Sequence, residues 1–194
     1  MHNLPQMKNS GSPGEKARAA IDRPAAMGED FDLRRYINPE KELPYESDPS
    51  RLPSADKEQM LAAGILLDNP RERSGTFLQI DNTPVHFSVQ QDGIEVMPTS
   101  EALERYDWIQ DYWWKAVAAD TDKYTANVEL NRADGYFIRA LPGQKSVLPV
   151  QACLYLAKSQ AIQNVHNIVI AEEGSELHII TGCTTAPRHD PGLH

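Results

Sequence analysis

The hydrophobic residues of this chain gather in short runs, which are densest toward its end. The runs 146–156, 165–174 and 175–183 each concentrate Val, Ile, Leu or Tyr and are punctuated by Gly, Asn or paired Glu. This pattern predicts short strands that stack at near-regular spacing with tight corners. The alternation predicts a further strand after the turn at 190–192. We therefore expect the front part of a larger repetitive β protein, incomplete at Leu193-His194.

A second group of strands is predicted upstream of these runs. Residues 76–80, 85–89 and 93–97 are rich in residues that favour strands, and the turn formers at 81–84 and 91–93 separate them. Asp, Asn, Gly and Pro at such positions are typical of tight turns between paired strands. We expect a meander or the opening of a sheet.

A capped helix is predicted over residues 54–64. Ser54 is suited to cap its beginning, and Gly64 is suited to end it. The residues before it, 30–49, hold enough apolar side chains to dock as one short helix and an extended arm, but too few to fold alone.

A longer aromatic helix is predicted over residues 100–119, with Thr99 or Ser100 as its cap. Its apolar residues recur at spacings of three and four, so they share one face that we expect to lie on the sheet. Trp108 and Trp113 make this helix a candidate surface for binding a partner protein. The residues of the shared face are Leu103, Tyr106, Ile109, Trp113 and Val117.

Four regions follow from these patterns. We expect a flexible tail over 1–28, a helical and extended arm over 29–75, a small α/β region with the aromatic helix over 76–123, and the stacked strands over 124–194. The first region lacks apolar periodicity, so burial cannot offset the entropy of ordering it. The predicted class is α+β leading into mainly β.

Composition and charge argue against nucleic-acid binding and against insertion in a membrane. A formal charge of −9 and a pI near 5.1, without a cluster of Lys and Arg, argue against a nucleic-acid partner. No stretch approaches the roughly 20 apolar residues that span a bilayer, and the beginning lacks the pattern of a signal peptide. We expect a cytoplasmic protein whose two cysteines stay reduced.

Cys183 is the first candidate for chemistry, because it follows Gly182 at the end of an apolar strand. A thiol at a strand rim, beside a glycine that allows close backbone approach, could accept sulfur or ligate a metal if its pKa were lowered. The alternative is a small buried hydrophobic residue. Cys153, in the middle of the run 150–156, is interpreted as ordinary core filling.

Histidines supply the second candidate site. Their positions near Cys183 suggest iron or zinc, but the spacing matches no paired motif of a structural zinc site. A metal-binding enzyme therefore stays an alternative. Beside His166, Asn167 stands at a strand entrance, where its amide is suited to bond the backbone at a corner. The four histidines are His166, His178, His189 and His194.

Four segments of the chain resemble a known protein family. The segments 135–146, 149–155, 164–183 and 192–194 resemble the SufB/SufD family, and most of all its short SufB-like type. The resemblance implies a scaffold component of the SUF machinery for iron–sulfur cluster assembly. It also implies a fold that continues from the N-terminal region into the first rungs of a right-handed parallel β-helix.

The resemblance implies partners as well. These are a SufC-like ATPase, a SufB/SufD-like subunit or a second copy forming a homodimer, and a cysteine desulfurase system as sulfur donor. The chain itself is expected not to be an enzyme. No firmly bound cofactor is expected in this part, and an iron–sulfur cluster is held transiently in the complete protein.

One functional residue of the SufB proteins has a counterpart in this chain. SufB proteins have a Gly-Cys-Thr/Ser-Ala-Pro segment whose cysteine is implicated in receiving sulfur, and Gly182-Cys183 with Ala186-Pro187 resembles it. Two threonines here occupy the space of one residue, so the turn differs. Cys183 is the predicted sulfur acceptor, and His178, His189 and His194 are weaker candidate ligands. The alternatives are an interaction module without chemistry in this half and a metal-binding enzyme.

Overall fold

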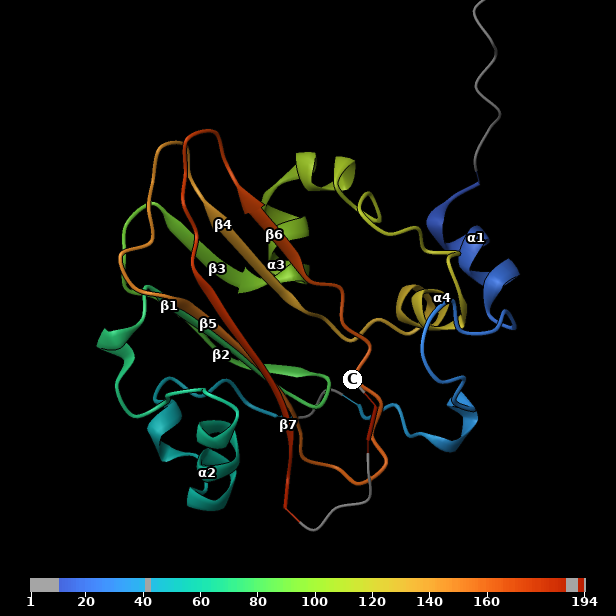
Figure 1. Cartoon of the computed structure of the whole chain (residues 1–194), viewed down its shortest axis with the longest axis horizontal. Helices are drawn as coiled ribbons and strands as arrows, with labels where there is room; N and C mark the ends of the chain where they lie inside the picture. The colour runs from blue at the N-terminus through green and yellow to red at the C-terminus, as the bar shows by residue number, and fades with distance from the viewer. Residues whose placement is uncertain (1–10, 41–42, 188–191, 194) are drawn as a thin grey trace, which may run out of the picture. The chain divides into compact units, whose positions relative to one another are not determined.

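The computed structural model describes residues 11–40, 43–187 and 192–193 (Figure 1). The chain divides into two compact units. The smaller unit comprises Met1–Phe31 and Asp111–Arg132. The larger unit comprises Asp32–Gln110 and Ala133–His194. Residues 1–10 of the tail predicted from composition lie outside the described residues.

The larger unit contains a sheet of four strands in the order β2-β1-β5-β7. Strands β1 and β2 pair antiparallel, whereas β1 with β5 and β5 with β7 pair parallel. The strands are β1 (Gly75–Ile80), β2 (Thr83–Val89), β5 (Val150–Leu156) and β7 (Ile179–Thr185).

A second sheet has three strands in the order β3-β4-β6. Strands β3 and β4 pair antiparallel, and β4 and β6 pair parallel. The strands are β3 (Ile94–Pro98), β4 (Tyr136–Ala140) and β6 (Ile168–Ala171). Consecutive strands from β4 to β7 therefore alternate between the two sheets. The strands predicted from the runs in the sequence are confirmed at β1, β2, β3, β5, β6 and β7.

Strand alternation sends the buried residues of β5 into two different apolar clusters. Along β5, Val150, Ala152 and Leu154 join apolar residues of β1, β3 and β4 in the core between the sheets. The intervening Cys153 and Tyr155 face the opposite side, where they pack with residues of α2 (Ser54–Ala62) and of the segment after it. This division follows the period of two that a strand imposes.

The expected right-handed parallel β-helix is wrong. The described residues form a small α/β fold with two mixed sheets and four α-helices, without a closed or solenoid-like stack of rungs. Rungs of a parallel β-helix pair only in parallel, whereas β1 with β2 and β3 with β4 pair antiparallel. The repeat of apolar runs is real, but it reflects strands distributed over two mixed sheets.

Helix α2 agrees with the predicted range, but its cap differs. Pro53 occupies the capping position without a side-chain bond, and Ser54 is the first helical residue. Gly64 ends this region at φ +84°, a left-handed conformation that glycine adopts without strain. Four short 3₁₀ turns complete the described helices: Leu33–Arg35, Pro49–Arg51, Pro70–Glu72 and Asp107–Asp111.

The long aromatic helix is wrong in its extent. Helix α3 spans only Thr99–Arg105, after which Tyr106 is extended and a 3₁₀ turn follows. Neither Thr99 nor Ser100 caps it, because Pro98 takes the capping position. Instead, the backbone N–H and the hydroxyl of Ser100 both donate to the carboxylate of Asp134, at 3.0 and 2.8 Å.

The smaller unit is built on α1 (Pro13–Ala20) and α4 (Lys123–Leu130). Its buried contacts are small, because Ala17, Ala20 and Ala126 form the cluster between the two helices. Such a small apolar face gives a weak pattern, and sequence reasoning did not predict α1.

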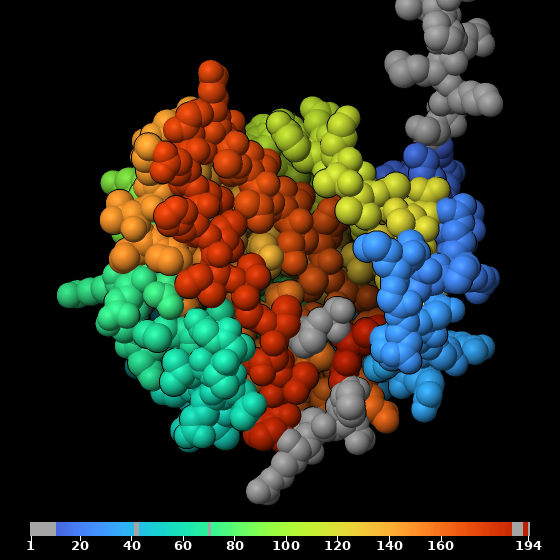
Figure 2. Space-filling model, viewed as in Figure 1, coloured from blue at the N-terminus to red at the C-terminus, as the bar shows by residue number. Residues whose placement is uncertain are grey.

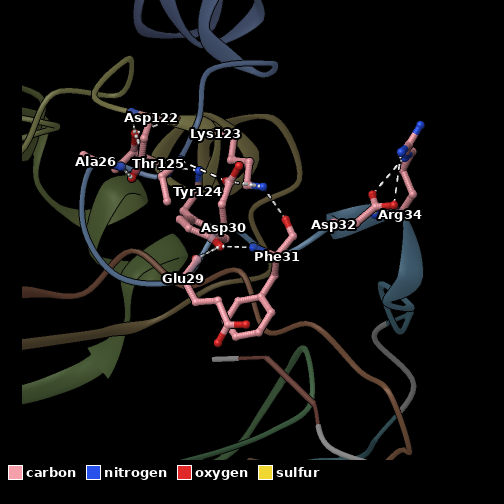
Figure 3. A network of polar contacts seen from close by, with 11 residues as sticks. Ala26, Glu29, Asp30, Phe31, Asp32, Arg34, Asp122, Lys123, Tyr124 and Thr125 are labelled. Atoms are coloured by element: carbon pink, nitrogen blue, oxygen red, sulfur yellow. Dashed lines mark hydrogen bonds and ion pairs between the residues drawn. The ribbon is translucent and has the colours of Figure 1, made fainter.

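Polar contacts fasten the segment before residue 32 to the beginning of α4 (Figure 3). The carboxylate of Asp122 accepts the backbone N–H groups of Tyr124, Thr125 and Ala26. Burial alone would raise the pKa of Asp122, but these hydrogen bonds outweigh it and hold the pKa below its usual value. Lys123 lies 2.5 Å from the carboxylate of Asp30.

No helix in the described part of the chain is long and apolar enough to cross a membrane.

Candidate functional site

Cys183 lies on β7, the last strand of the four-stranded sheet. The residue is exposed and its thiol is free. Figure 2 shows the C-terminal segments, in red, on the surface of the face in view. In the described sheet, β7 has a hydrogen-bonded neighbour on one side only, namely β5. A strand edge therefore carries the thiol predicted to accept sulfur.

The register shows which way this thiol faces. Cys183 pairs with Leu154 of β5, and paired residues of neighbouring strands project to the same face. Leu154 belongs to the core between the sheets. Cys183 therefore lies on the face of the four-stranded sheet that carries this core, at the edge strand β7. Two effects raise the pKa of Tyr136 on β4. Burial of Tyr136 is the larger effect, and the second is repulsion from the negative charge of Cys183.

The electrostatics of Cys183 do not activate it. Local burial of the sulfur raises the pKa of the thiol above its usual value, although the residue as a whole is exposed. A raised pKa leaves the thiol protonated at neutral pH, and the thiolate is the nucleophile. Attack by Cys183 therefore needs a base or a positive charge close to the sulfur.

Gly182 explains how the strand before the thiol fits the fold. A Cβ atom at Gly182 would lie 2.9 Å from Cγ1 of Ile65 and 3.0 Å from the carbonyl oxygen of Ala63. Both distances are shorter than ordinary contacts, so only glycine allows the segment after α2 to approach β7 this closely. The prediction that Gly182 permits a close backbone approach is confirmed.

Cys153 has the role of core filling that the sequence predicts. It is fully buried, and burial together with the charge of Cys183 raises its pKa to about 12. Cys153 pairs with Gly182 rather than with Cys183, so the two thiols project from opposite faces of the sheet. The two thiols should therefore differ in reactivity, and their opposite directions argue against a disulfide between them.

Of the three weaker histidine candidates for metal binding, the structure describes only His178. His178 is exposed just before β7, and its backbone N–H donates to the hydroxyl of Ser146 at 2.7 Å. His189 and His194 lie outside the described residues. Among the residues that are described, no group of three or more His, Cys, Asp or Glu side chains could hold a metal ion.

Asn167 has the corner role that its position predicts. Its Oδ1 accepts the backbone N–H of Tyr136 at 3.0 Å, at the beginning of β4. The neighbouring Gly135 has φ +146°, and a Cβ atom there would lie 2.5 Å from the carbonyl oxygen of His166. The amide of Asn167 thus fastens the entrance of β6 to that of β4.

Trp108 packs on a partly buried ion cluster that sequence reasoning missed. The guanidinium of Arg139 lies 4.8 Å from the ring centroid of Trp108. It also bonds the carboxylates of Glu95, at 3.3 Å, and Glu172, at 2.7 Å. Side-chain exposure is only 17% for Arg139, so this pair of ion contacts is largely shielded from water. Trp108 therefore has a structural role in the larger unit.

Burial and hydrogen bonding oppose each other in this cluster. Burial would lower the pKa of Arg139, but its bonds to Glu172 and Glu95 raise it. Burial first, and then the hydrogen bond to Glu95, raise the pKa of Tyr106. The Tyr106 hydroxyl donates this bond at 2.6 Å. The guanidinium thus stays charged and the phenol stays neutral.

Trp113 belongs to the smaller unit, so one helix does not bring it together with Trp108. Its ring lies 4.5 Å from the guanidinium carbon of Arg132 and 6.5 Å from the ring of Trp114. Trp114 has φ +53°, and its indole N–H donates to Glu129 at 2.6 Å. The binding of a partner by Trp108 and Trp113 stays a prediction.

The geometry thus defines a small α/β protein with an exposed thiol on an edge strand. Comparison of its sequence with known proteins shows which proteins it is similar to. The chain is 45% identical over 185 residues to an iron–sulfur cluster assembly SufBD family protein of Methanothermobacter thermautotrophicus, covering 93% of this chain and 45% of the relative. It is 52% identical over 132 residues to such a protein of Archaeoglobus fulgidus, covering 68% of this chain and 35% of the relative.

The identity is lower to the iron–sulfur cluster assembly protein SufB of Bacillus subtilis, at 23% over 168 residues, 84% of this chain and 36% of SufB. No family model matches the chain. The chain therefore belongs to the SufBD family, which confirms the resemblance seen in its sequence. It spans about half the length or less of these curated relatives.

Proposed function

We propose that the chain is a scaffold component of iron–sulfur cluster assembly and not itself an enzyme. The names of its relatives support this function. As the resemblance to the family implies, we assign ATP hydrolysis to a SufC-like partner and the second scaffold subunit to a SufB/SufD-like chain or a second copy. The growing cluster is cargo, and the cytoplasm keeps both thiols reduced.

The observation that carries the chemical part of this proposal is the contrast between the two thiols. Cys183 is exposed on an edge strand, whereas Cys153 is fully buried with a pKa of about 12. A protein donor can reach the first sulfur but not the second without unfolding the sheet. Cys183 is therefore the residue assigned to receive sulfur.

The transfer needs no external oxidant. The thiolate of Cys183 attacks the outer sulfur of a persulfide on the donor protein, and a new S–S bond forms at Cys183. The S–S bond of the donor breaks at the same time, and the donor cysteine leaves as a thiolate that takes up a proton. The raised pKa of Cys183 means that the donor complex must supply the base or cation that generates its thiolate.

Anaerobic incubation with a cysteine desulfurase and free cysteine tests this function. Intact mass and peptide mapping locate the added sulfur, with Cys183→Ser as the test variant and Cys153→Ala as the matched control. We expect one added sulfur on Cys183, none in Cys183→Ser and an unchanged amount in Cys153→Ala.

Two results would reject sulfur transfer at this residue. One is added sulfur on Cys153 of the folded protein, and the other is no modification of either thiol while the desulfurase is active. The second result favours an interaction module without chemistry in this part of the chain.

A further inference from the structure

A hollow of about 400 Å³ lies beside α2 in the larger unit, outside the region of Cys183. Its apolar wall comes from α2 and from the segment that follows it. Ile65 and Leu67 are buried in the core behind the hollow, so they form a fixed floor. Leu61 is 57% exposed at the rim. A large apolar side chain beside a hollow of this size is typical of a binding surface.

The floor is held in place by a buried amide. The side chain of Gln151 accepts the backbone N–H of Leu66 at 3.1 Å and donates to its carbonyl oxygen at 2.6 Å. Gln151 lies on β5 and is fully buried. The Gln151 side chain therefore fastens the backbone of the segment after α2 to the sheet, and the hollow is preformed.

The charges around the hollow favour a positive ligand. The ammonium of Lys57 donates to the carbonyl oxygen of Ser50 at 2.8 Å and to the carboxylate of Asp68 at 2.9 Å. Lys57 is thus already engaged. The residues that line the hollow include one positive charge, Lys57, and two negative charges, Glu58 and Asp68. The whole chain has a formal charge of −9.

We propose that this hollow is a docking site for an amphipathic, basic segment of a partner protein. An apolar side chain of about the size of leucine contacts Leu61 and the floor, and a neighbouring Lys or Arg lies at Glu58, because Asp68 already pairs with Lys57. A small anion fits poorly, because the cation at the rim is neutralised and the net charge there is negative. The site is small for a protein interface, so it adds one anchor to a larger contact.

The position of the hollow is compatible with chemistry at Cys183. Its floor residue Ile65 packs against Gly182 of β7, on the face opposite to that of Cys183. A segment docked there leaves the thiol uncovered. The docking proposal does not depend on sulfur transfer, so either can fail while the other holds.

Fluorescence polarisation with synthetic peptides tests the proposal on the full chain. The probe is a labelled helical peptide with leucines at spacings of three and four and lysines beside them. A second peptide replaces each lysine with glutamate, and a third replaces each leucine with serine. Leu61→Ser and Glu58→Lys alter the hollow, while Val147→Ser changes a side chain that is 81% exposed elsewhere.

We expect the basic peptide to bind the unaltered protein at low salt, and the other two peptides to bind about tenfold more weakly or not at all. Leu61→Ser and Glu58→Lys should each weaken binding by about fivefold to tenfold, and Val147→Ser by less than about twofold. The proposal is overturned if the basic peptide does not bind, binds no better than the acidic one, or is unaffected by Leu61→Ser. Circular dichroism confirms that each variant is folded.

Discussion

The phenol of Tyr155 donates a hydrogen bond to the carboxylate of Asp56 at 2.5 Å, from the middle of a sheet to the first turn of the helix that covers it. Tyr155 is fully buried, and its hydroxyl is the polar link between β5 and α2. Burial first, and then this bond, raise the pKa of Tyr155 far above its usual value. The link therefore requires a neutral phenol.

Removing this hydroxyl should destabilise the larger unit. We expect Tyr155→Phe to lower the free energy of unfolding by about 1 kcal/mol, because it deletes a hydrogen bond and leaves Asp56 without that donor. Urea denaturation measures the change, with the half-buried Tyr36→Phe as the control. An equal loss in both variants would show that the bond to Asp56 contributes nothing.

The same bond predicts how stability depends on high pH. Because the folded-state pKa of Tyr155 is raised, its contribution is complete below the unfolded-state pKa of about 10 and is lost as the pH rises above it. The unaltered protein should therefore lose stability more steeply above about pH 10 than Tyr155→Phe does. Urea midpoints measured from neutral to alkaline pH give this comparison, and parallel curves would contradict it.

Gly182 should not tolerate a side chain. Gly182→Ala places a methyl group 2.9 Å from Ile65 and 3.0 Å from a backbone oxygen, and the backbone cannot move aside as a side chain can. We expect a loss of roughly 1–3 kcal/mol in the free energy of unfolding. Thiol reactivity at Cys183 should rise as the strand shifts.

The neighbouring Thr181 provides the control for this substitution, because it is exposed on the same strand. Thr181→Ala should change the stability by less than about 1 kcal/mol. A Gly182→Ala protein as stable as Thr181→Ala would mean that the segment after α2 does not press on β7.

The partly buried ion cluster at Arg139 should contribute more to stability than an exposed ion pair does. Arg139→Leu leaves Glu95 and Glu172 close together without their cation, at side-chain exposures of 20% and 30%. We expect a loss of roughly 2–3 kcal/mol, and partial recovery when Glu172→Gln is added.

Arg105 offers the matched exposed pair, since it contacts Glu101 at 2.7 Å with side-chain exposures of 51% and 35%. Arg105→Leu should change the stability by less than about 1 kcal/mol. Thermal or chemical unfolding separates the two cases, and similar losses for both arginines would refute the burial argument.

The two cysteines should differ in reactivity with iodoacetamide. Cys183 should react in the folded protein, and its rate should keep rising with pH beyond the usual thiol range, because burial raises its pKa. Cys153, with a pKa of about 12, should react only after unfolding. Peptide mapping by mass spectrometry distinguishes them, and labelling of Cys153 in the native state would contradict the structure.

Local patterns predicted the elements that depend on local signals. Alternating residues and turn formers located β1, β2 and β3, and the glycine before Cys183 indicated a close approach that the structure contains. The direction of strand pairing has no such signal. The spacing of apolar runs predicted stacked strands, and this spacing is the same for parallel rungs and for mixed sheets. The right-handed parallel β-helix was an implication of the family resemblance, and the antiparallel pairs of the described sheets contradict it.

Tertiary contacts explain the other differences. The spacing of Tyr106 and its neighbours fits a long helix, but Tyr106 and Trp108 turn instead toward Arg139 and end α3 early. The partners of Arg139 stand 44 and 33 residues away in the sequence, so no local motif marks the cluster. The candidate thiol at Cys183 was found because a glycine and an apolar strand precede it.

The alternation of β4 to β7 between two sheets has a consequence for folding. Each strand in this series must cross to the other sheet before its successor can pair, so almost every parallel contact joins residues distant along the chain. Such non-local pairing slows folding. It also ties the two sheets into one cooperative unit, in which neither can unfold first without pulling strands out of the other.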